Sequence, residues 1–159
     1  MNEKKILVTF YSRTGTTRKA AEAIRKELGC DIEEIIDLVD RKGFIGTMKA
    51  CYSALKALPT VIKNPQADAS LYDVVIIGTP VWAGRVSNAV RTYITANKDK
   101  FRNVAFFATM SNGGGDKVLC EMEELSGKKP SGVLQLLRRE INDGSYLDKV
   151  KSFAAEIKA

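Results

Sequence analysis

Runs of consecutive apolar residues alternate along the chain with stretches in which apolar residues recur every three or four positions. Continuous runs are typical of strands buried on both faces of a parallel sheet, whereas the three-to-four spacing is typical of helices with one buried side. The pattern predicts strands at residues 5–11, 31–37, 73–78, 104–108 and 133–137. It predicts helices whose apolar residues span 20–28, 44–58, 86–94, 118–125 and 146–157.

This order, a strand and then a helix five times over, requires right-handed parallel crossovers and a sheet covered on both faces. No internal repeat, low-complexity tract or long linker divides the 159 residues. We therefore expect one domain over residues 1–159. Its fold class is α/β, a three-layer, doubly wound arrangement with a five-stranded parallel sheet between two layers of helices.

The helix predicted at 44–58 has the clearest apolar stripe in the chain. Its members are Phe44, Ile45, Met48, Cys51, Tyr52, Leu55 and Leu58, and Pro59 ends it. Such a stripe is typical of the side of a helix that faces the core. Because Cys51 lies on it and Cys120 lies within a later helix, we expect the cysteines to be packed rather than reactive.

Residues with capping preferences flank several of the predicted helices. Gly29 follows the first helix and is expected to end it. Ser87 and Asp116 stand where their side chains could accept hydrogen bonds from the first amides of the third and fourth helices. Ser145 and Asp148 have the spacing of a capping box at the start of the last helix.

The cysteine and histidine counts exclude several kinds of chemistry. The chain has three widely spaced cysteines with no Cys-x-x-Cys pair, which argues against a disulfide framework or a zinc site. It has no histidine, so no histidine-dependent triad or HExxH metal site can form. Chemistry must therefore come from a bound cofactor, from carboxylates, or from hydroxyls and backbone amides, and we expect no metal.

The charge balance bears on partners and location. The chain carries 25 Lys and Arg against 19 Asp and Glu, a net charge of +6. The basic residues are scattered rather than gathered in a stripe with aromatics, so we expect no nucleic-acid partner. No apolar run approaches the about 18 residues of a membrane span, and the first residues do not resemble a signal peptide. We expect a cytoplasmic protein without a membrane partner.

Ligands of open α/β sheets bind at the carboxyl ends of the strands, so polar clusters in the loops that follow the strands are candidate binding residues. The loop after the first strand, Ser12 to Thr17, holds four hydroxyls and Gly15 directly before a helix. Amides at a helix start, with a glycine that allows close approach, form an anion site. The simpler interpretation is an ordinary helix cap, which one or two hydroxyls would satisfy. Four hydroxyls favour phosphate binding.

The loop after the third predicted strand contains the only tryptophan, Trp82. A large aromatic ring at the end of a sheet can stack on a planar ligand, although it can also simply cover the sheet edge. Pro80 and Gly84 indicate a shaped turn, with Gly84 free to take a positive φ. Arg85 follows, and we expect its side chain to be solvated.

The loop after the fourth predicted strand contains three consecutive glycines, Gly113 to Gly115. Backbone lying against a flat ligand would explain them, and a merely flexible loop is the alternative. Together the three loops predict a phosphate site, an aromatic plate and a glycine-rich wall at neighbouring strand ends. A phosphorylated planar cofactor fits all three.

Two of these loops resemble motifs of the flavodoxin family. The S-x-T-G-x-T loop appears as Ser12-Arg13-Thr14-Gly15-Thr16-Thr17, and the T-P-x-W loop as Thr79-Pro80-Val81-Trp82, followed by Ala83-Gly84. The order of elements is similar along nearly the whole chain. The resemblance implies a parallel sheet of order 2-1-3-4-5 and the cofactor FMN. No Walker A, GxGxxG or C-x₅-R motif points to a competing function.

The resemblance also implies which residues bind the cofactor. The loop Ser12, Arg13, Thr14, Gly15, Thr16 and Thr17 would hold the FMN phosphate. The loop Pro80, Val81, Trp82, Ala83 and Gly84 would flank the isoalloxazine ring, with Trp82 against one face. The loop Ser111, Asn112, Gly113, Gly114 and Gly115 would line the pyrimidine side. No protein side chain is expected to be catalytic, because the flavin performs the redox chemistry.

Three differences from the family pattern keep alternatives open. Thr16 stands where the family usually has asparagine, the third loop lacks a tyrosine for the second flavin face, and the chain is basic where flavodoxins are acidic. Our main hypothesis is an FMN-binding electron-transfer protein whose partner is a redox protein or a small-molecule acceptor. The alternatives are an FMN-dependent NAD(P)H:quinone-type reductase and a flavin-free module that acts through its basic surface. We expect a monomer or a weak dimer.

Overall fold

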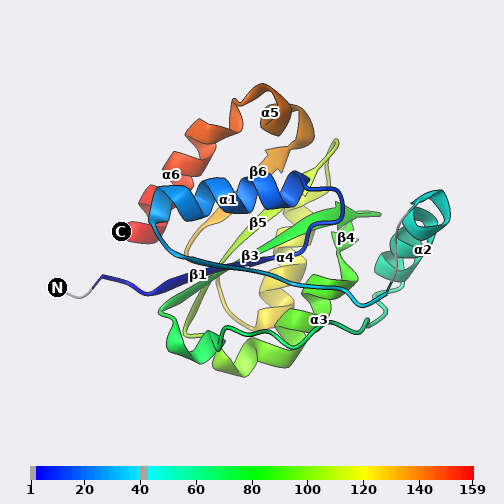
Figure 1. Cartoon of the computed structure of the whole chain (residues 1–159), viewed down its shortest axis with the longest axis horizontal. Helices are drawn as coiled ribbons and strands as arrows, with labels where there is room; N and C mark the ends of the chain where they lie inside the picture. The colour runs from blue at the N-terminus through cyan, green and yellow to red at the C-terminus, as the bar shows by residue number, and fades with distance from the viewer. Residues whose placement is uncertain (1–2, 40–42) are drawn as a thin grey trace.

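The computed structural model describes residues 3–39 and 43–159, and its centre is one twisted sheet (Figure 1). Five parallel strands lie in the order β2-β1-β3-β5-β6. Their bounds are β1 Ile6–Phe10, β2 Asp31–Glu34, β3 Val74–Trp82, β5 Asn103–Met110 and β6 Val133–Leu137. A two-residue strand, β4 (Arg85–Val86), pairs antiparallel with the end of β3. Counting the parallel strands alone, the predicted order 2-1-3-4-5 is confirmed.

Two helical layers cover the sheet, as the alternation of side chains along β1 requires. Ile6, Val8 and Phe10 pack on one face with α1, α5 and α6, whereas Leu7 and Tyr11 face α3 and α4. The helices are α1 Thr16–Leu28, α2 Gly43–Leu55, α3 Asn88–Asn97, α4 Gly115–Ser126, α5 Arg138–Asp143 and α6 Tyr146–Lys158. Two short 3₁₀ helices, η1 Ala69–Leu71 and η2 Lys98–Lys100, precede β3 and β5. The doubly wound α/β class is confirmed.

The strand register places the loops of interest at one edge. Phe10 pairs with Gly78, Gly78 pairs with Phe107, and Phe107 pairs with Leu134. The segments that follow β1, β3, β5 and β6 therefore leave the same edge of the sheet. The second strand is shorter than predicted, ending at Glu34 rather than Asp37, because Ile36 is exposed and lies outside the ladder.

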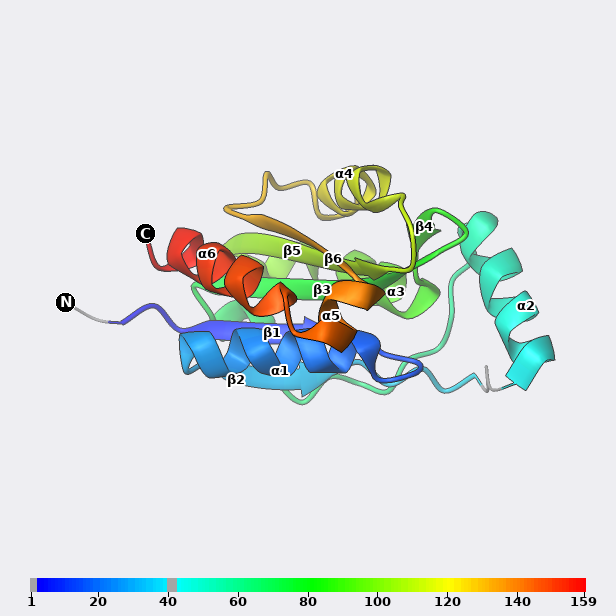
Figure 2. The ribbon, with the colours of Figure 1, turned by 90° about the horizontal axis from the view of Figure 1, so that it is seen from above.

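Helix α2 differs most from its prediction. It ends at Leu55, before the predicted end at 58, and it lies at the end of the molecule outside both layers (Figure 2). The small residues Gly46, Ala50 and Ala54 are its buried side. The predicted apolar stripe points into solvent, with Phe44 80% exposed and Tyr52 60% exposed. The expectation of a packed stripe was wrong, since small residues allow closer backbone contact than large ones.

The predicted caps are mostly not formed. Gly29 ends α1 in a left-handed conformation, as expected. Ser87 is the N-cap residue of α3, but its side chain makes no capping bond. Gly114 rather than Asp116 is the N-cap of α4, and Asp116 lies in the first turn, where its carboxylate accepts a bond from Gln135. Ser145 makes no capping bond at α6, so the predicted box is absent.

Among residues 3–39 and 43–159, no helix is both long enough and apolar enough to cross a membrane.

Candidate functional site

A cleft of about 180 Å³ opens at the carboxyl ends of the strands. Its walls come from the loop after β1, the inner side of α2, the ends of β3 and β5, and the start of α5. The lining residues are Ser12, Arg13, Thr14, Thr16, Thr17, Thr47, Ala50, Cys51, Pro80, Val81, Trp82, Thr109, Met110, Ser111 and Arg138. The cleft therefore brings together residues from all three predicted loops.

The amino end of α1 opens into this cleft without a side-chain cap. Its N-cap residue is Gly15, which has φ 96°, a conformation that glycine takes without steric cost. The Gly15 amide donates to Ser12 Oγ at 3.1 Å, and this bond closes the loop. Within residues 3–39 and 43–159, no side chain caps the first turn of α1. Its first amides, which have no partner within a helix, are therefore left for a ligand.

The hydroxyls of the loop do not all have the same role. Thr17 is buried, and its Oγ1 lies 2.8 Å from Thr109 Oγ1 of β5. This bond ties the start of α1 to the end of β5, so Thr17 acts in the structure of the cleft. Thr14 and Thr16 also line the cleft, and both are more exposed than Thr17.

The cleft is positively charged. Its charged lining residues in the described chain are Arg13 and Arg138, and no acidic side chain lines it. Arg13 Nη1 donates to Thr47 Oγ1 at 2.7 Å, which joins the loop to α2. Arg18, also in the first turn of α1, forms a bidentate pair with Glu34 of β2. This carboxylate offsets the cost of a cation at a helix start.

Trp82 stands at the mouth of the cleft at the end of β3. Its indole meets the Tyr11 ring edge-on, with centroids 5.4 Å apart and planes at 89°. Trp82 is half-buried against the core, so it covers the end of the sheet. It also lines the cleft, where part of its ring is accessible to a ligand. The following turn into β4 has Ala83 at φ 49° and Gly84 at φ 70°. Two successive positive φ values are those of a type I′ hairpin.

The glycine-rich loop contributes less to the cleft than predicted. Ser111 lines it, whereas Asn112, Gly113, Gly114 and Gly115 do not. Gly115 is the first residue of α4, and a Cβ there would lie 2.2 Å from Gln135 Oε1. That glycine is therefore needed for packing. A Cβ on Gly114 would lie 3.4 Å from Val81 and 3.6 Å from Gly84, so this loop and the hairpin are neighbours.

Gly15, Ala83 and Gly84 also do not line the cleft, although they shape its loops. Arg85 is not solvated as expected. Its guanidinium donates to Glu121 at 3.1 and 3.2 Å and to the Leu55 carbonyl at 3.2 Å. Arg91 also pairs with Glu121. Arg85 therefore holds the end of α2 in place.

Sequence reasoning missed several cleft residues. Thr109 and Met110 end β5, and the strand-end rule could have identified them. Thr47, Ala50 and Cys51 come from α2, whose inner side the apolar stripe did not reveal. Arg138 starts α5, a short helix that no periodic signal announced.

The three cysteines lie in different environments, and the expectation that all are packed was partly wrong. Cys120 is exposed. Cys30 is partly buried, and this burial raises the pKa of its thiol to about 11. Cys51 is partly buried and lines the cleft.

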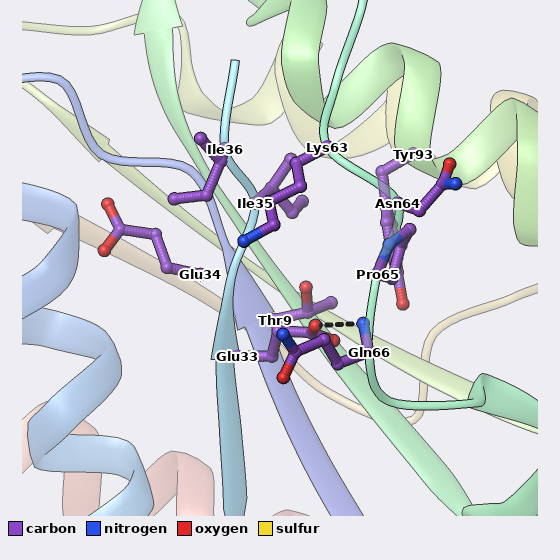
Figure 3. Close-up of a pocket in the computed structure, with 10 residues that line it drawn as sticks. All are labelled: Thr9, Glu33, Glu34, Ile35, Ile36, Lys63, Asn64, Pro65, Gln66 and Tyr93. Atoms are coloured by element: carbon purple, nitrogen blue, oxygen red, sulfur yellow. Dashed lines mark hydrogen bonds between the residues drawn. The ribbon is translucent and has the colours of Figure 1, made fainter. Parts of the chain in front are cut away.

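A second cavity, of about 190 Å³, lies between β1, β2, residues 63–66 and α3 (Figure 3). Thr9 and Tyr93 are buried there. Burial raises the pKa of Tyr93. The Gln66 amide donates to Glu33 at 2.5 Å across this cavity. With two glutamates in its lining and no helix start, this cavity is less suited to an anion than the cleft.

The fold and cleft together define a doubly wound α/β protein with a positively charged cleft at the carboxyl ends of its strands. A sequence model of the flavodoxin family matches residues 5–153. The chain belongs to the flavodoxin family. No relative matches among the curated proteins.

Three solved structures illustrate the likeness. A flavoprotein from Lactobacillus acidophilus NCFM, crystallised in complex with FMN, is 25% identical, with a TM-score of 0.73 over 92% of this chain and 97% of that chain. A Bacteroides eggerthii protein assigned as a flavoprotein is 24% identical, with a TM-score of 0.69 over 93% and 98%. Oxidised flavodoxin 1 from Bacillus cereus is 20% identical, with a TM-score of 0.57 over 96% and 95%. The latter two show the fold alone.

Proposed function

We propose that this protein binds FMN in the cleft and transfers electrons through it. The observation that carries the proposal is the uncapped start of α1, which opens into a cleft that, among the described residues, is lined by two arginines and no acid. Helix-start amides, hydroxyls and guanidinium groups are the donors that a phosphate monoester requires. The likeness to a flavoprotein crystallised with FMN supports the same cofactor.

The chain's own residues would position the cofactor. The amides after Gly15, with Ser12, Thr14 and Thr16, would bind the phosphate, and Arg13 and Arg138 would balance its charge. Trp82 would contact the ring. The cleft is smaller than the about 300 Å³ typical of enclosing ligand sites, so part of the ring would lie outside it. Bound FMN supplies the redox chemistry, accepting and returning one or two electrons.

Replacing Arg138 tests the phosphate site. We expect Arg138→Ala to weaken FMN binding about tenfold, since a charge-assisted contact contributes about 1.5–3 kcal/mol. Riboflavin, which lacks the phosphate, should bind both proteins equally. Arg139→Ala is the matched control, because Arg139 is the exposed neighbour that does not line the cleft. Titrations followed by flavin fluorescence measure the affinities of all three proteins for both ligands, and equal losses for FMN and riboflavin would contradict the assignment.

The cysteines provide an internal test of where FMN binds. Cys51 lines the cleft and Cys120 is exposed elsewhere on α4. We expect saturating FMN to slow alkylation of Cys51 by iodoacetamide at least fivefold and to leave Cys120 unchanged. Mass spectrometry of peptides after timed quenching gives each rate. Unchanged labelling of Cys51 with FMN bound would place the cofactor elsewhere.

A second candidate is an FMN-dependent reductase of small acceptors such as quinones. It is favoured by the loop after β5, where the exposed residues Ser111 and Asn112 offer no aromatic ring to a bound flavin. Oxidation of NADPH with a quinone and no partner protein would support the reductase. Absence of that turnover, with FMN bound, favours the electron carrier. A protein that takes up no FMN would instead support the flavin-free module.

A further inference from the structure

The outward side of α2 is an apolar surface without a partner in the described chain. We call Phe44, Ile45, Met48, Tyr52 and Leu55 the α2 face, and each is more than half exposed. Isolated exposed apolar residues are ordinary, but a contiguous set on one helix side marks an interaction surface. The face continues into a groove of about 560 Å³ between Tyr52, Leu58, Val61 and Val39.

Polar bonds to the rest of the molecule fix the α2 face in its outward position. Arg13 donates a hydrogen bond to Thr47, and Arg85 donates one to the Leu55 carbonyl. Asn88 Nδ2 donates to the Leu58 carbonyl at 2.6 Å. Figure 2 shows that α2 stands apart at the end of the molecule. The face is therefore presented by the fold.

The α2 face also lies directly behind the candidate FMN site. Thr47, Ala50 and Cys51 of the same helix line the cleft. A molecule docked on the face would thus be separated from the cleft by about one helix diameter, about 10–12 Å with side chains. This placement connects the surface with the proposed cofactor.

The charges around the α2 face indicate the charge of its partner. Residues 43–67 contain three basic residues, Lys49, Lys56 and Lys63, and no acidic one. Lys49, Lys56 and Lys63 are exposed. The neighbouring acid, Asp37, is engaged by the Val39 amide at 3.0 Å and by Thr60 Oγ1 at 2.9 Å. The surface therefore has an apolar centre and a positive rim, and an acidic rim would complement it.

A second copy of the chain fits this surface poorly. A two-fold contact presents the same patch from both subunits, so lysine rims would meet lysine rims. The chain carries +6 overall, which adds repulsion. An acidic protein partner has neither cost.

We infer that the α2 face docks an acidic one-electron carrier protein that exchanges electrons with FMN in the adjacent cleft. This inference rests on the proposed function. Two reduced carriers each lose one electron and are oxidised, and FMN gains the two electrons with two protons from solvent. Electrostatic attraction brings the partners together, and the apolar centre holds them.

The test uses the FMN-loaded protein and a reduced acidic [2Fe–2S] ferredoxin as the probe. Anaerobic stopped-flow absorbance between about 400 and 600 nm, separated into the spectra of the flavin and of the iron–sulfur cluster, gives the second-order rate. We expect this rate to fall about tenfold as salt rises from 0.05 to 0.5 M, since salt screens exposed charges. We expect the double variant Lys49→Glu/Lys56→Glu to react at least fivefold more slowly at low salt, and Phe44→Ser to react about threefold more slowly.

Matched controls separate docking from general effects. Lys98→Glu/Lys100→Glu makes the same charge change on η2, before β5 and at the opposite edge of the sheet, and Leu71→Ser removes an exposed apolar side chain there. Both should react like the natural protein. Dithionite, a small reductant, should reduce every variant at one rate, and their FMN affinities should agree.

Each other outcome overturns the inference. If the α2-face variants react with ferredoxin like the controls, the face is not the docking site, although FMN binding still stands. A concentration-dependent dimer in sedimentation that Phe44→Ser abolishes, with the ferredoxin rate unchanged, assigns the face to a second copy. Binding to anionic phosphatidylglycerol vesicles with no effect on that rate assigns it to a membrane. A protein that takes up no FMN overturns both this inference and the proposed function.

Discussion

Ala83 is a residue whose backbone, rather than its side chain, shapes the hairpin between β3 and β4. It has φ 49° although it is not glycine, and it precedes Gly84 at φ 70°. A left-handed alanine costs about 1 kcal/mol or more, because its Cβ approaches the following carbonyl. The sequence predicted the turn and the positive φ of Gly84, but nothing in the residue type indicated that Ala83 shares it.

Replacing Ala83 with asparagine should therefore stabilise the protein. Asparagine tolerates the left-handed region, and Asn-Gly is the preferred pair for this turn. We expect Ala83→Asn to raise the free energy of unfolding by about 0.5–1 kcal/mol in urea denaturation. Ala83→Val, whose branched side chain suits positive φ poorly, should lower it. A destabilising Ala83→Asn would contradict the turn geometry.

Tyr72 provides a pH-dependent prediction. Burial, together with the bond that its hydroxyl donates to Asp31 at 2.9 Å, raises the pKa of this phenol to about 12 from its usual 10. The folded state favours the neutral phenol, so this contribution to stability is complete below pH 10 and is lost between about pH 10 and 12. We expect the free energy of unfolding of the natural protein to fall more steeply over that range than that of Tyr72→Phe. Parallel slopes in urea titrations at each pH would contradict it.

The candidate site was only partly predictable from single residues. Ser12 to Thr17 and Trp82 stand out because hydroxyls, a glycine and an aromatic follow predicted strands, and the structure brings all of them except Gly15 to one cleft. Arg138 was missed because an arginine on the surface looks like any other until the fold places it. The packing role of Gly115 was not predicted, because glycines needed for packing and glycines facing a ligand are alike in sequence.

At the scale of elements, helices α1 and α4 begin in the same way. Both α1 and α4 start after a glycine with φ above 90°, Gly15 and Gly114, and neither has a side-chain cap. Capping preferences predicted side-chain caps at Asp116 and Ser145 that do not form. N-cap preferences describe the ends of isolated helices. In this protein the geometry of the loop between strand and helix determines the conformation of the N-cap residue.

The contact between β3 and β5 predicts the effect of a small insertion into the core. Gly78 pairs with Phe107, and a Cβ at Gly78 would lie 2.0 Å from Phe107 Cζ. Because Phe107 is fully buried, its ring has no room to withdraw. We expect Gly78→Ala to destabilise the protein by about 1–3 kcal/mol in urea denaturation.

A double-mutant cycle checks this contact. Phe107→Leu removes the clashing atoms, so Gly78→Ala should cost less in that background than in the natural protein. Gly113→Ala is the control, since nothing lies within 4 Å of a Cβ there. Equal costs of Gly78→Ala in both backgrounds would show that the two side chains do not compete for space.

At the scale of the whole molecule, the sequence predicted the architecture because strand and helix periods are distinct and crossovers have one hand. The position of α2 was not predictable in this way. Its period of 3.6 identified the helix correctly, but period alone does not say whether large or small residues face the protein. Here Gly46, Ala50 and Ala54 do so, and the larger side chains are left outside.

The outward orientation of the apolar stripe of α2 can be tested by comparing two phenylalanines, both of which lie on predicted apolar stripes. Phe153 of α6 is 2% exposed in the core, whereas Phe44 of α2 is 80% exposed. Phe153→Ala should lower the free energy of unfolding by about 3–5 kcal/mol, because it leaves a cavity. Phe44→Ala should change it by no more than about 0.5 kcal/mol, as exposed positions do. Urea denaturation of both variants decides the matter. If Phe44→Ala cost several kcal/mol, the stripe of α2 would face inward in solution, and the outward surface proposed for docking would not exist.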